Sequence, residues 1–132
     1  MKIEVSNGEI IDKYTILEIK LSQIKDESKL KNIQHEYDVL TPDVQQIYRS
    51  CQDENQLKKL HSDLLTINKK LWDIEDDIRE CERAKDFGQT FIDLARAVYY
   101  TNDDRSEVKK EINLFTGSDL IEEKSYEDYK SE

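Results

Sequence analysis

The sequence predicts an all-α protein: an antiparallel helical bundle around one long coiled-coil-like helix at about residues 53–86, followed by a frayed acidic tail. Three observations lead to this prediction. The chain has 132 residues but only three glycines and one proline, which leaves few residues for hairpin turns. Its apolar residues recur at steps of three and four, the spacing of one helix face. The only strand-like residues, Ile3 and Val5, form one short stretch without a partner.

The N-terminal part of the chain is expected to form three helices. The first covers about residues 10–24 and is opened by a capping box at Ser6, where the sequence reads S-x-x-E. The second covers about 30–40 and ends before Pro42, because a residue that precedes proline disfavours the α conformation. Thr-Pro then supplies an N-cap and a first helical residue for a short third helix over 41–48.

The strongest pattern in the chain is a heptad seam whose apolar residues alternate at steps of three and four. Its members are Leu57, Leu60, Leu64, Ile67, Leu71, Ile74, Ile78 and Cys81. This spacing is typical of a coiled coil. A helix of about 30 residues is about 45 Å long, which exceeds the core of a compact chain of this size. Leu65 and Trp72 add a second apolar stripe, so we expect this helix to bury two sides, and its seam to pair with a second copy.

The C-terminal part is expected to form two more helices and the tail. Phe91, Leu94 and Val98 indicate a helix that follows Gly88. A capping box at Asp104 opens the last helix, which Gly117 closes. Residues 118–132 carry six acids and no apolar period, so we expect an acidic tail, extended or partly disordered. No linker or internal repeat interrupts residues 1–117, which are therefore expected to form a single helical domain.

The charge balance limits the classes of partner. Twenty Lys and Arg face thirty Asp and Glu, for a net charge of −10. Affinity for phosphates depends on basic residues that displace counterions, so a nucleic acid or an anionic membrane is not expected as a partner. The sequence has neither a secretory signal nor a run of about 18 apolar residues, which predicts a cytoplasmic protein. Two cysteines and two histidines match no zinc spacing, and no cofactor is expected.

One group of acidic residues could bind a metal ion. Asp73, Asp77 and Glu80 share a helix face and, with Asp93 from a facing helix, could hold Mg²⁺ together with a phosphorylated substrate. All-α nucleotide pyrophosphohydrolases work in this way, but their E-E-x-x-E motif is not matched, because Arg79 stands where the third acid belongs. The alternative interpretation is a solvated face with helical ion pairs such as Glu75 with Arg79, and no bound metal.

A second group of polar residues could bind an anion. It contains Arg96, Tyr99, Tyr100, Asn102, Asp103, Arg105 and Lys109, at the expected end of one helix and start of the next. Guanidinium groups and free helix N-terminal amides both suit phosphate or carboxylate. The alternative is that these are capping residues and that Arg96 pairs with Asp93 on the same helix.

Several segments resemble a family of small bacterial and phage proteins known only as a domain of unknown function. The residues that carry the resemblance are Gly8-Glu9-Ile-Ile-Asp12-Lys13, Thr15-Ile-Leu-Glu18-Ile-Lys20, Leu71-Trp72-x-Ile74-Glu75-Asp76-x-Ile78-Arg79, Phe91 to Arg105, Lys109, Ile112-Asn113 and Glu122-Glu123-Lys124-x-Tyr126. Members of that family are sometimes encoded among polysaccharide-assembly and glycosyltransferase genes. The resemblance therefore implies a role beside sugar-nucleotide chemistry. It also implies that a shared function lies in the polar motif residues: Glu9, Asp12, Lys13, Glu75, Asp76, Arg79, Arg96, Asn102, Asp103, Arg105 and Lys109.

Two functional hypotheses follow. The first is a non-enzymatic helical interaction module that binds a protein partner or a second copy through the seam from Leu57 to Ile78. The second is an enzyme or binding protein for a phosphorylated or nucleotide-linked small molecule, which includes sugar nucleotides, with Mg²⁺ as a cofactor in this case only. The second would use Glu75, Asp76 and Arg79 with Arg96 and Arg105. It requires either that the carboxylates of the long helix lie within metal-bridging reach of another acid, or that Arg96 and Arg105 point into one concave pocket.

Overall fold

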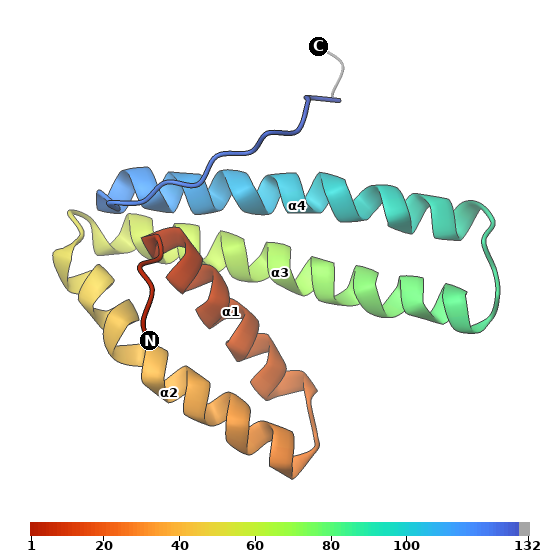
Figure 1. Cartoon of the computed structure of the whole chain (residues 1–132), viewed down its shortest axis with the longest axis horizontal. Coiled ribbons are helices and arrows are strands. Elements are labelled where there is room, and N and C mark those ends of the chain that lie inside the picture. The colour runs from red at the N-terminus through yellow and green to blue at the C-terminus, as the bar shows by residue number, and fades with distance from the viewer. Residues whose placement is uncertain (130–132) are drawn as a thin grey trace.

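The computed structural model describes residues 1–129, which contain four helices and no strand. The helices are α1 (Asn7–Gln23), α2 (Glu27–Ser50), α3 (Glu54–Arg83) and α4 (Gln89–Thr116). Helices α3 and α4 run antiparallel along their full length, and the hairpin of α1 and α2 crosses one half of this pair (Figure 1). In the described part of the chain, no helix combines the length and the apolar character needed to cross a bilayer. The all-α prediction is confirmed.

Side-chain caps fix the helix ends near the positions predicted. The Ser6 hydroxyl accepts a hydrogen bond from the backbone N–H of Glu9 at 3.1 Å and opens α1. Asp53 accepts from two backbone N–H groups at the start of α3. Gly117 closes α4 with a φ of 66°, a left-handed conformation that glycine adopts at low cost.

Two predicted helix boundaries are wrong, and the first is at Pro42. Helix α2 continues through this residue to Ser50, so the two helices expected over 30–40 and 41–48 are one. Thr41 is held at this point by its hydroxyl, which donates to the Tyr37 carbonyl at 2.8 Å and lies 3.0 Å from the Tyr14 hydroxyl. Val44 and Ile47 extend the buried face beyond the proline, so packing against the rest of the chain offsets the local cost of proline.

The second wrong boundary is at residues 102–104. The capping residues there predicted that one helix ends and another begins, but α4 runs unbroken from Gln89 to Thr116. No glycine or proline lies between Gly88 and Gly117, and Thr101 is only 2% exposed. Asp103 binds Lys124 and Tyr129 of the segment after the helix instead of capping a helix start.

The core lies where α1 and α2 cross α3 and α4. Its buried residues are Ile11, Ile47, Leu57, Leu60, Leu64 and Ile112. Half of the predicted seam is therefore covered by this chain's own helices. The expectation that Leu57, Leu60 and Leu64 pair with a second copy is wrong, because these three side chains are at most 3% exposed within one chain.

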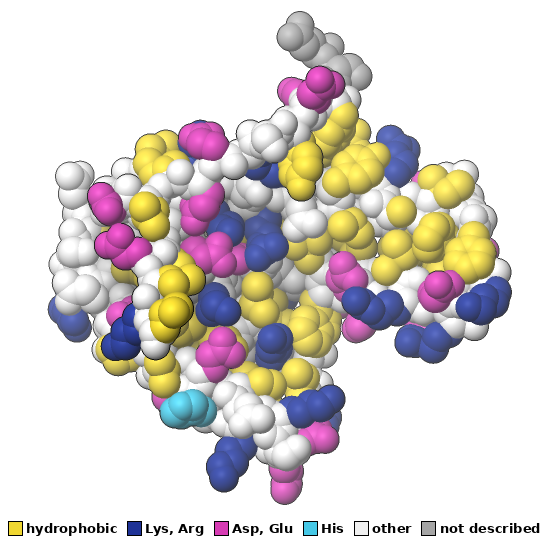
Figure 2. Space-filling view, viewed as in Figure 1, with side chains coloured by type: hydrophobic (Ala, Val, Ile, Leu, Met, Phe, Trp, Pro, Cys, Tyr) yellow, Lys and Arg dark blue, Asp and Glu magenta, His cyan; other side chains and the backbone are white. Residues whose placement is uncertain are grey.

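Beyond this core, α3 and α4 continue as a two-helix arm, which we define as residues 71–100. After Asn68, Ile74 is the only buried residue of α3, and no residue of α4 before Thr101 is buried. The arm projects past the α1–α2 hairpin in Figure 1. In Figure 2 apolar side chains cover much of its visible face, with charged side chains along the edge. The other half of the seam thus lies in a layer only two helices thick.

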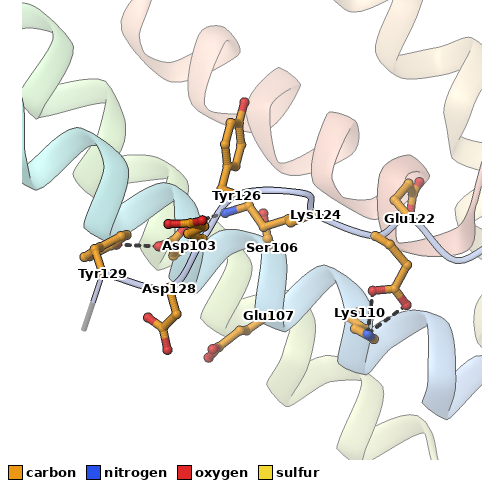
Figure 3. Close-up of a pocket in the computed structure, with 11 residues that line it drawn as sticks. Asp103, Ser106, Glu107, Lys110, Glu122, Lys124, Tyr126, Asp128 and Tyr129 are labelled. Carbon is orange, nitrogen blue, oxygen red and sulfur yellow. Dashed lines mark hydrogen bonds and ion pairs between the residues drawn. The ribbon is translucent and has the colours of Figure 1, made fainter. Parts of the chain in front are cut away.

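The segment after α4, residues 118–129, has no helix and runs back along α4 (Figure 1). Lys110 of α4 forms an ion pair with Glu123 of this segment, and Asp103 of α4 forms one with Lys124. The Tyr129 hydroxyl donates to Asp103. Figure 3 shows these contacts around a hollow of about 320 Å³ between the segment and α4. Residues 130–132 of the predicted tail lie outside the described part.

Candidate functional site

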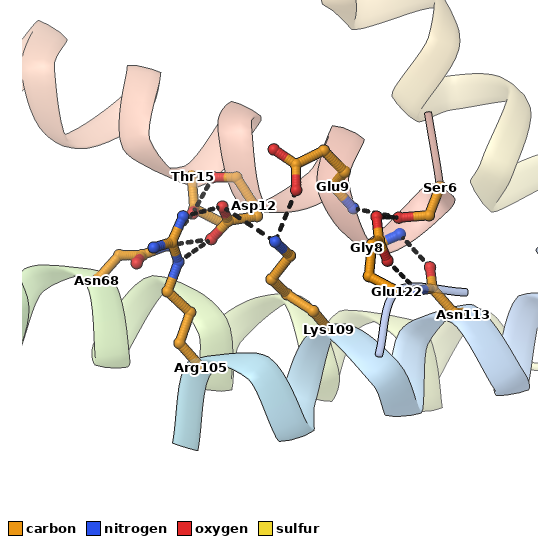
Figure 4. A network of polar contacts seen from close by, with 10 residues as sticks. All are labelled: Ser6, Gly8, Glu9, Asp12, Thr15, Asn68, Arg105, Lys109, Asn113 and Glu122. Atoms are coloured by element: carbon orange, nitrogen blue, oxygen red, sulfur yellow. Dashed lines mark hydrogen bonds and ion pairs between the residues drawn. The ribbon is translucent and has the colours of Figure 1, made fainter. Parts of the chain in front are cut away.

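A buried carboxylate joins three helices at the point where the arm begins. Asp12 of α1 is 1% exposed. Arg105 of α4 forks onto it, with Nε 2.9 Å from Oδ1 and Nη2 bound to Oδ2. The amide of Asn68, on α3, donates to the same Oδ1 at 2.9 Å. Figure 4 shows the three side chains converging. The hydrogen bond to Asp12 raises the pKa of Arg105 above its ordinary value.

Each charged group in this network has a partner, which is the condition for burying charge at tolerable cost. The Thr15 hydroxyl donates to the Asp12 carbonyl at 2.7 Å and accepts from Asn68 at 2.8 Å. The Lys109 ammonium binds Glu9 at 2.6 Å and lies 4.0 Å from Asp12. Throughout residues 1–129, no buried side-chain nitrogen or oxygen lacks a hydrogen bond. The network therefore fixes α1 on α3 and α4.

A second part of the network joins the start of α1 to the end of α4. The backbone N–H of Gly8 donates to the Asn113 side chain at 2.6 Å. A Cβ at position 8 would lie 2.4 Å from the Lys109 carbonyl oxygen, so only glycine fits between these helices. Glu122 accepts from Ser6 at 2.5 Å and from Asn113 at 3.1 Å. Burial acts to raise the pKa of Glu122, but these hydrogen bonds and Lys109 lower it below its ordinary value.

A cleft opens beside the buried Asp12, and we call it the junction cleft. It has a volume of about 480 Å³ and is lined by Ile16 of α1, by Asn68, Leu71, Trp72, Glu75, Asp76 and Arg79 of α3, and by Asn102 and Arg105 of α4. Its polar groups are partly paired: Arg79 binds Glu75 at 2.6 Å, and Arg105 binds Asp12. The cleft size is in the range of small-molecule sites.

The structure brings most of the predicted polar residues together around Arg105. Five of them line the junction cleft: Glu75, Asp76, Arg79, Asn102 and Arg105. On the other side of Arg105, a smaller hollow of about 260 Å³ is lined by Glu9, Asp12 and Lys13 among others. Lys109 lies beside Glu9. The three polar motif segments, which are far apart in the sequence, thus meet at one junction.

Four predicted residues lie elsewhere. Arg96 is exposed on the arm, where hydrogen bonding to Tyr99 raises its pKa above the ordinary value. Tyr99 stacks on Tyr100 and contacts Tyr129, and Asp103 binds the segment after α4. Arg105 lines the junction cleft and Arg96 does not. The requirement that both arginines share one pocket is not met.

The acidic residues considered for metal binding are dispersed. Glu80 pairs with Arg83, and Asp93 accepts a hydrogen bond from Gln89 at 2.7 Å. Within residues 1–129, no three His, Cys, Asp or Glu side chains lie close enough to hold a metal ion. The described geometry therefore gives the four-carboxylate arrangement of Asp73, Asp77, Glu80 and Asp93 no support.

Sequence reasoning missed Asn68 and Thr15. Asn68 occupies a position beside the seam, where a polar residue in a long charged helix reads as solvated. Its burial depends on α1 crossing α3 at that level, and no local pattern reports such a crossing. Thr15 opens one of the segments that carry the family resemblance but was not selected as a site residue, because a threonine in a helix commonly bonds its own backbone.

The fold and the site define a class: a small all-α protein in which two helical hairpins meet at a polar junction and one hairpin extends as an arm. The chain belongs to a family of unknown function, DUF6165, whose model matches residues 1–131. No curated protein matches the chain. No solved structure matches it either.

Proposed function

We propose that this protein is a helical interaction module that associates with a second copy through the apolar face of its arm. The observation that carries the proposal is the thinness of the arm, where apolar residues on two helices have no third helix over them. We define the arm face as Leu71, Trp72 and Ile78 of α3, Phe91, Ile92, Leu94 and Val98 of α4, and Phe87 between them. Phe87 and Ile92 are 51% and 47% exposed, respectively, and the other six are half-buried.

The α4 side of the arm face follows a regular helical stripe. Phe91, Leu94 and Val98 of α4 are spaced by three and four residues, and Phe87, in the turn before the helix, contacts Phe91 edge to face at 5.3 Å between centroids. A two-helix layer buries only part of such a stripe. A further layer of helices would remove the rest from water, at about 25 cal/mol per Å² of apolar surface.

A second copy is the occupant that the charges favour. A two-fold contact places a surface against itself, so its rim must be self-complementary. The edge of the arm along α3 and the turn after it mixes both signs, with acids at Asp73, Asp77 and Glu80 and bases at Arg83 and Lys85. If the arms of two copies pack face to face, helices α3 and α4 of both copies would form a four-helix antiparallel coiled-coil bundle. The heptad spacing of Leu71, Ile74 and Ile78 supports this form of association.

A matched pair of variants on α4 tests the proposal. Ile92→Glu places a charge on the arm face, whereas Leu114→Glu places one on an apolar residue that is 61% exposed at the other end of the same helix. Molar mass is measured by light scattering after size exclusion at about 100 μM. We expect Ile92→Glu to be monomeric, and the unmodified chain and Leu114→Glu to have twice that mass. A monomeric unmodified chain, or equal dimerisation of both variants, would overturn the proposal.

The rival hypothesis of a phosphorylated or nucleotide-linked ligand has less support. Both arginines of the junction cleft already bind carboxylates of this chain. A phosphate would therefore either lie beside Asp12 or Glu75, with the repulsion between like charges, or replace that carboxylate as the partner of a guanidinium group. Replacing Asp12 would leave a buried carboxylate without its cation, which is costly.

A further inference from the structure

We propose that the junction cleft binds a small organic ammonium ion, namely a protonated amine attached to a flat or aliphatic apolar group. This inference does not rest on the association of the arms. Leu71 and Trp72 belong both to the arm face and to the cleft, but the polar contacts proposed for the ligand are with Asn68 and Asp76, which lie outside the arm face. Three features of the cleft support it: its charge balance, an unused acceptor on the largely buried Asn68, and an apolar wall that includes Trp72.

The charge balance around the cleft favours a cation. Three carboxylates, those of Asp12, Glu75 and Asp76, surround two guanidinium groups. The guanidinium groups of Arg105 and Arg79 bind Asp12 and Glu75. Asp76 is the carboxylate that remains, since no residue among 1–129 forms an ion pair with it. A cationic ligand would neutralise Asp76, whereas an anion would add to the excess of negative charge.

The unused acceptor is the side-chain oxygen of Asn68. This residue is 5% exposed, and its amide nitrogen makes both of its hydrogen bonds, to Asp12 and Thr15. Those two bonds fix the orientation of the amide, so the oxygen faces away from them. No donor in the described chain binds this oxygen, and since no fully buried polar atom lacks a partner, solvent reaches it from the cleft that Asn68 lines. A solvent-accessible carbonyl oxygen on a largely buried residue can accept a hydrogen bond from an N–H donor of a ligand.

The apolar wall is formed by Ile16, Leu71 and the half-buried indole of Trp72. An aromatic face attracts ammonium groups through its quadrupole, and the two aliphatic side chains suit a hydrocarbon group. An ammonium that donates to Asn68 and pairs with Asp76 would place its carbon skeleton along this wall. The cleft volume of about 480 Å³ accommodates an amine of about ten non-hydrogen atoms.

Trp72 is the only tryptophan in the chain, so its fluorescence reports directly on the cleft. The probe is 2-phenylethylammonium, and the matched ligands are neutral 2-phenylethanol and anionic 3-phenylpropionate. Each is titrated into the full chain at low micromolar concentration, followed by Trp72 emission and by the NMR signals of the Asn68 side-chain amide. The titrations are repeated on Ile92→Glu, so that any change in arm association is distinguished from ligand binding.

Two adjacent carboxylates provide the matched variants. Asp76 lines the cleft and Asp77 does not, although both are exposed on α3. We expect saturable binding of 2-phenylethylammonium, weakened about fivefold or more by Asp76→Asn and changed less than about twofold by Asp77→Asn. We expect no saturable binding of the alcohol or the carboxylate.

Three results would overturn the proposal. One is the absence of any change in both signals up to about 10 mM ammonium probe. Another is that 3-phenylpropionate or inorganic phosphate binds as tightly as the amine. The third is that the Asp76 and Asp77 variants lose the same affinity, which would indicate a general electrostatic effect of this acidic helix. Loss of arm association in the first test does not affect any of these outcomes.

Discussion

Replacing Asp12 by Asn would remove the charge on which the junction of α1, α3 and α4 depends. Asp12 is 1% exposed and receives two bonds from Arg105 and one from Asn68. Breaking a buried ion pair by removing one partner costs about 3–5 kcal/mol. The Arg105 side chain is 29% exposed, so water can partly solvate it, and we expect the lower end of the range, about 3 kcal/mol.

That loss corresponds to a measurable change in melting temperature. An unfolding entropy of about 2.1 cal/mol/K per residue gives about 0.28 kcal/mol/K for 132 residues, so Tm should fall by about 10 °C. Urea unfolding at low protein concentration, followed by circular dichroism, measures the free energy of unfolding. Lys13→Gln is the control, since it removes an exposed pair with Glu36 at 3.6 Å and should cost less than about 1 kcal/mol.

A double-mutant cycle of Asp12→Asn with Arg105→Gln isolates the interaction energy between Asp12 and Arg105 from the contributions of their other contacts. We expect a coupling energy of at least about 1.5 kcal/mol between positions 12 and 105, because the two side chains bond directly. A cost below about 1 kcal/mol for Asp12→Asn, or a coupling near zero, would refute the view that this ion pair holds α1 in place.

Two further predictions concern the attachment of α1 and of the segment after α4. Gly8→Ala should destabilise the fold by about 2 kcal/mol in thermal melts, because its Cβ would meet the Lys109 carbonyl oxygen. The control Gly88→Ala should be nearly neutral, because its Cβ would meet only a flexible Asp86 side chain at 3.2 Å. Equal effects of the two substitutions would contradict this prediction. Glu122 has a pKa below its ordinary value in the folded state, so its contribution is complete above about pH 4.5 and is lost as the pH falls through that lower value. ¹⁵N relaxation should therefore show residues 118–129 ordered at pH 7 and mobile near pH 3; order that persists at pH 3, or that survives Glu122→Gln unchanged at pH 7, would argue against this role.

The helices were largely predictable because their signals are local. The caps at Ser6 and Asp53 and the left-handed Gly117 mark ends that involve only neighbouring residues. Pro42 and the polar residues at 102–104 carry equally local signals for a break, yet α2 and α4 run through both. Contacts from distant parts of the chain overrode these signals, and sequence periodicity contains no information about such contacts.

The candidate site was predictable only in part, for the same reason. The motif segments named Asp12 and Arg105 separately, but their pairing depends on α1 crossing α4, which the close approach at Gly8 permits. Asn68 was not predicted, because burial of one amide among charged neighbours has no sequence signature. The heptad seam correctly located a long helix, but a seam does not specify whether a partner helix comes from the same chain.

Hydrogen–deuterium exchange at two protein concentrations tests the central claim, that a second copy covers the arm. Backbone amides of residues 71–100 belong to the arm, whereas those of α1 and α2 lie on the other half of the molecule. We predict that exchange of the arm amides is at least several-fold slower at about 200 μM than at 1 μM, with little change in α1 and α2. Equal exchange at both concentrations, or slowing confined to α1 and α2, would contradict the claim.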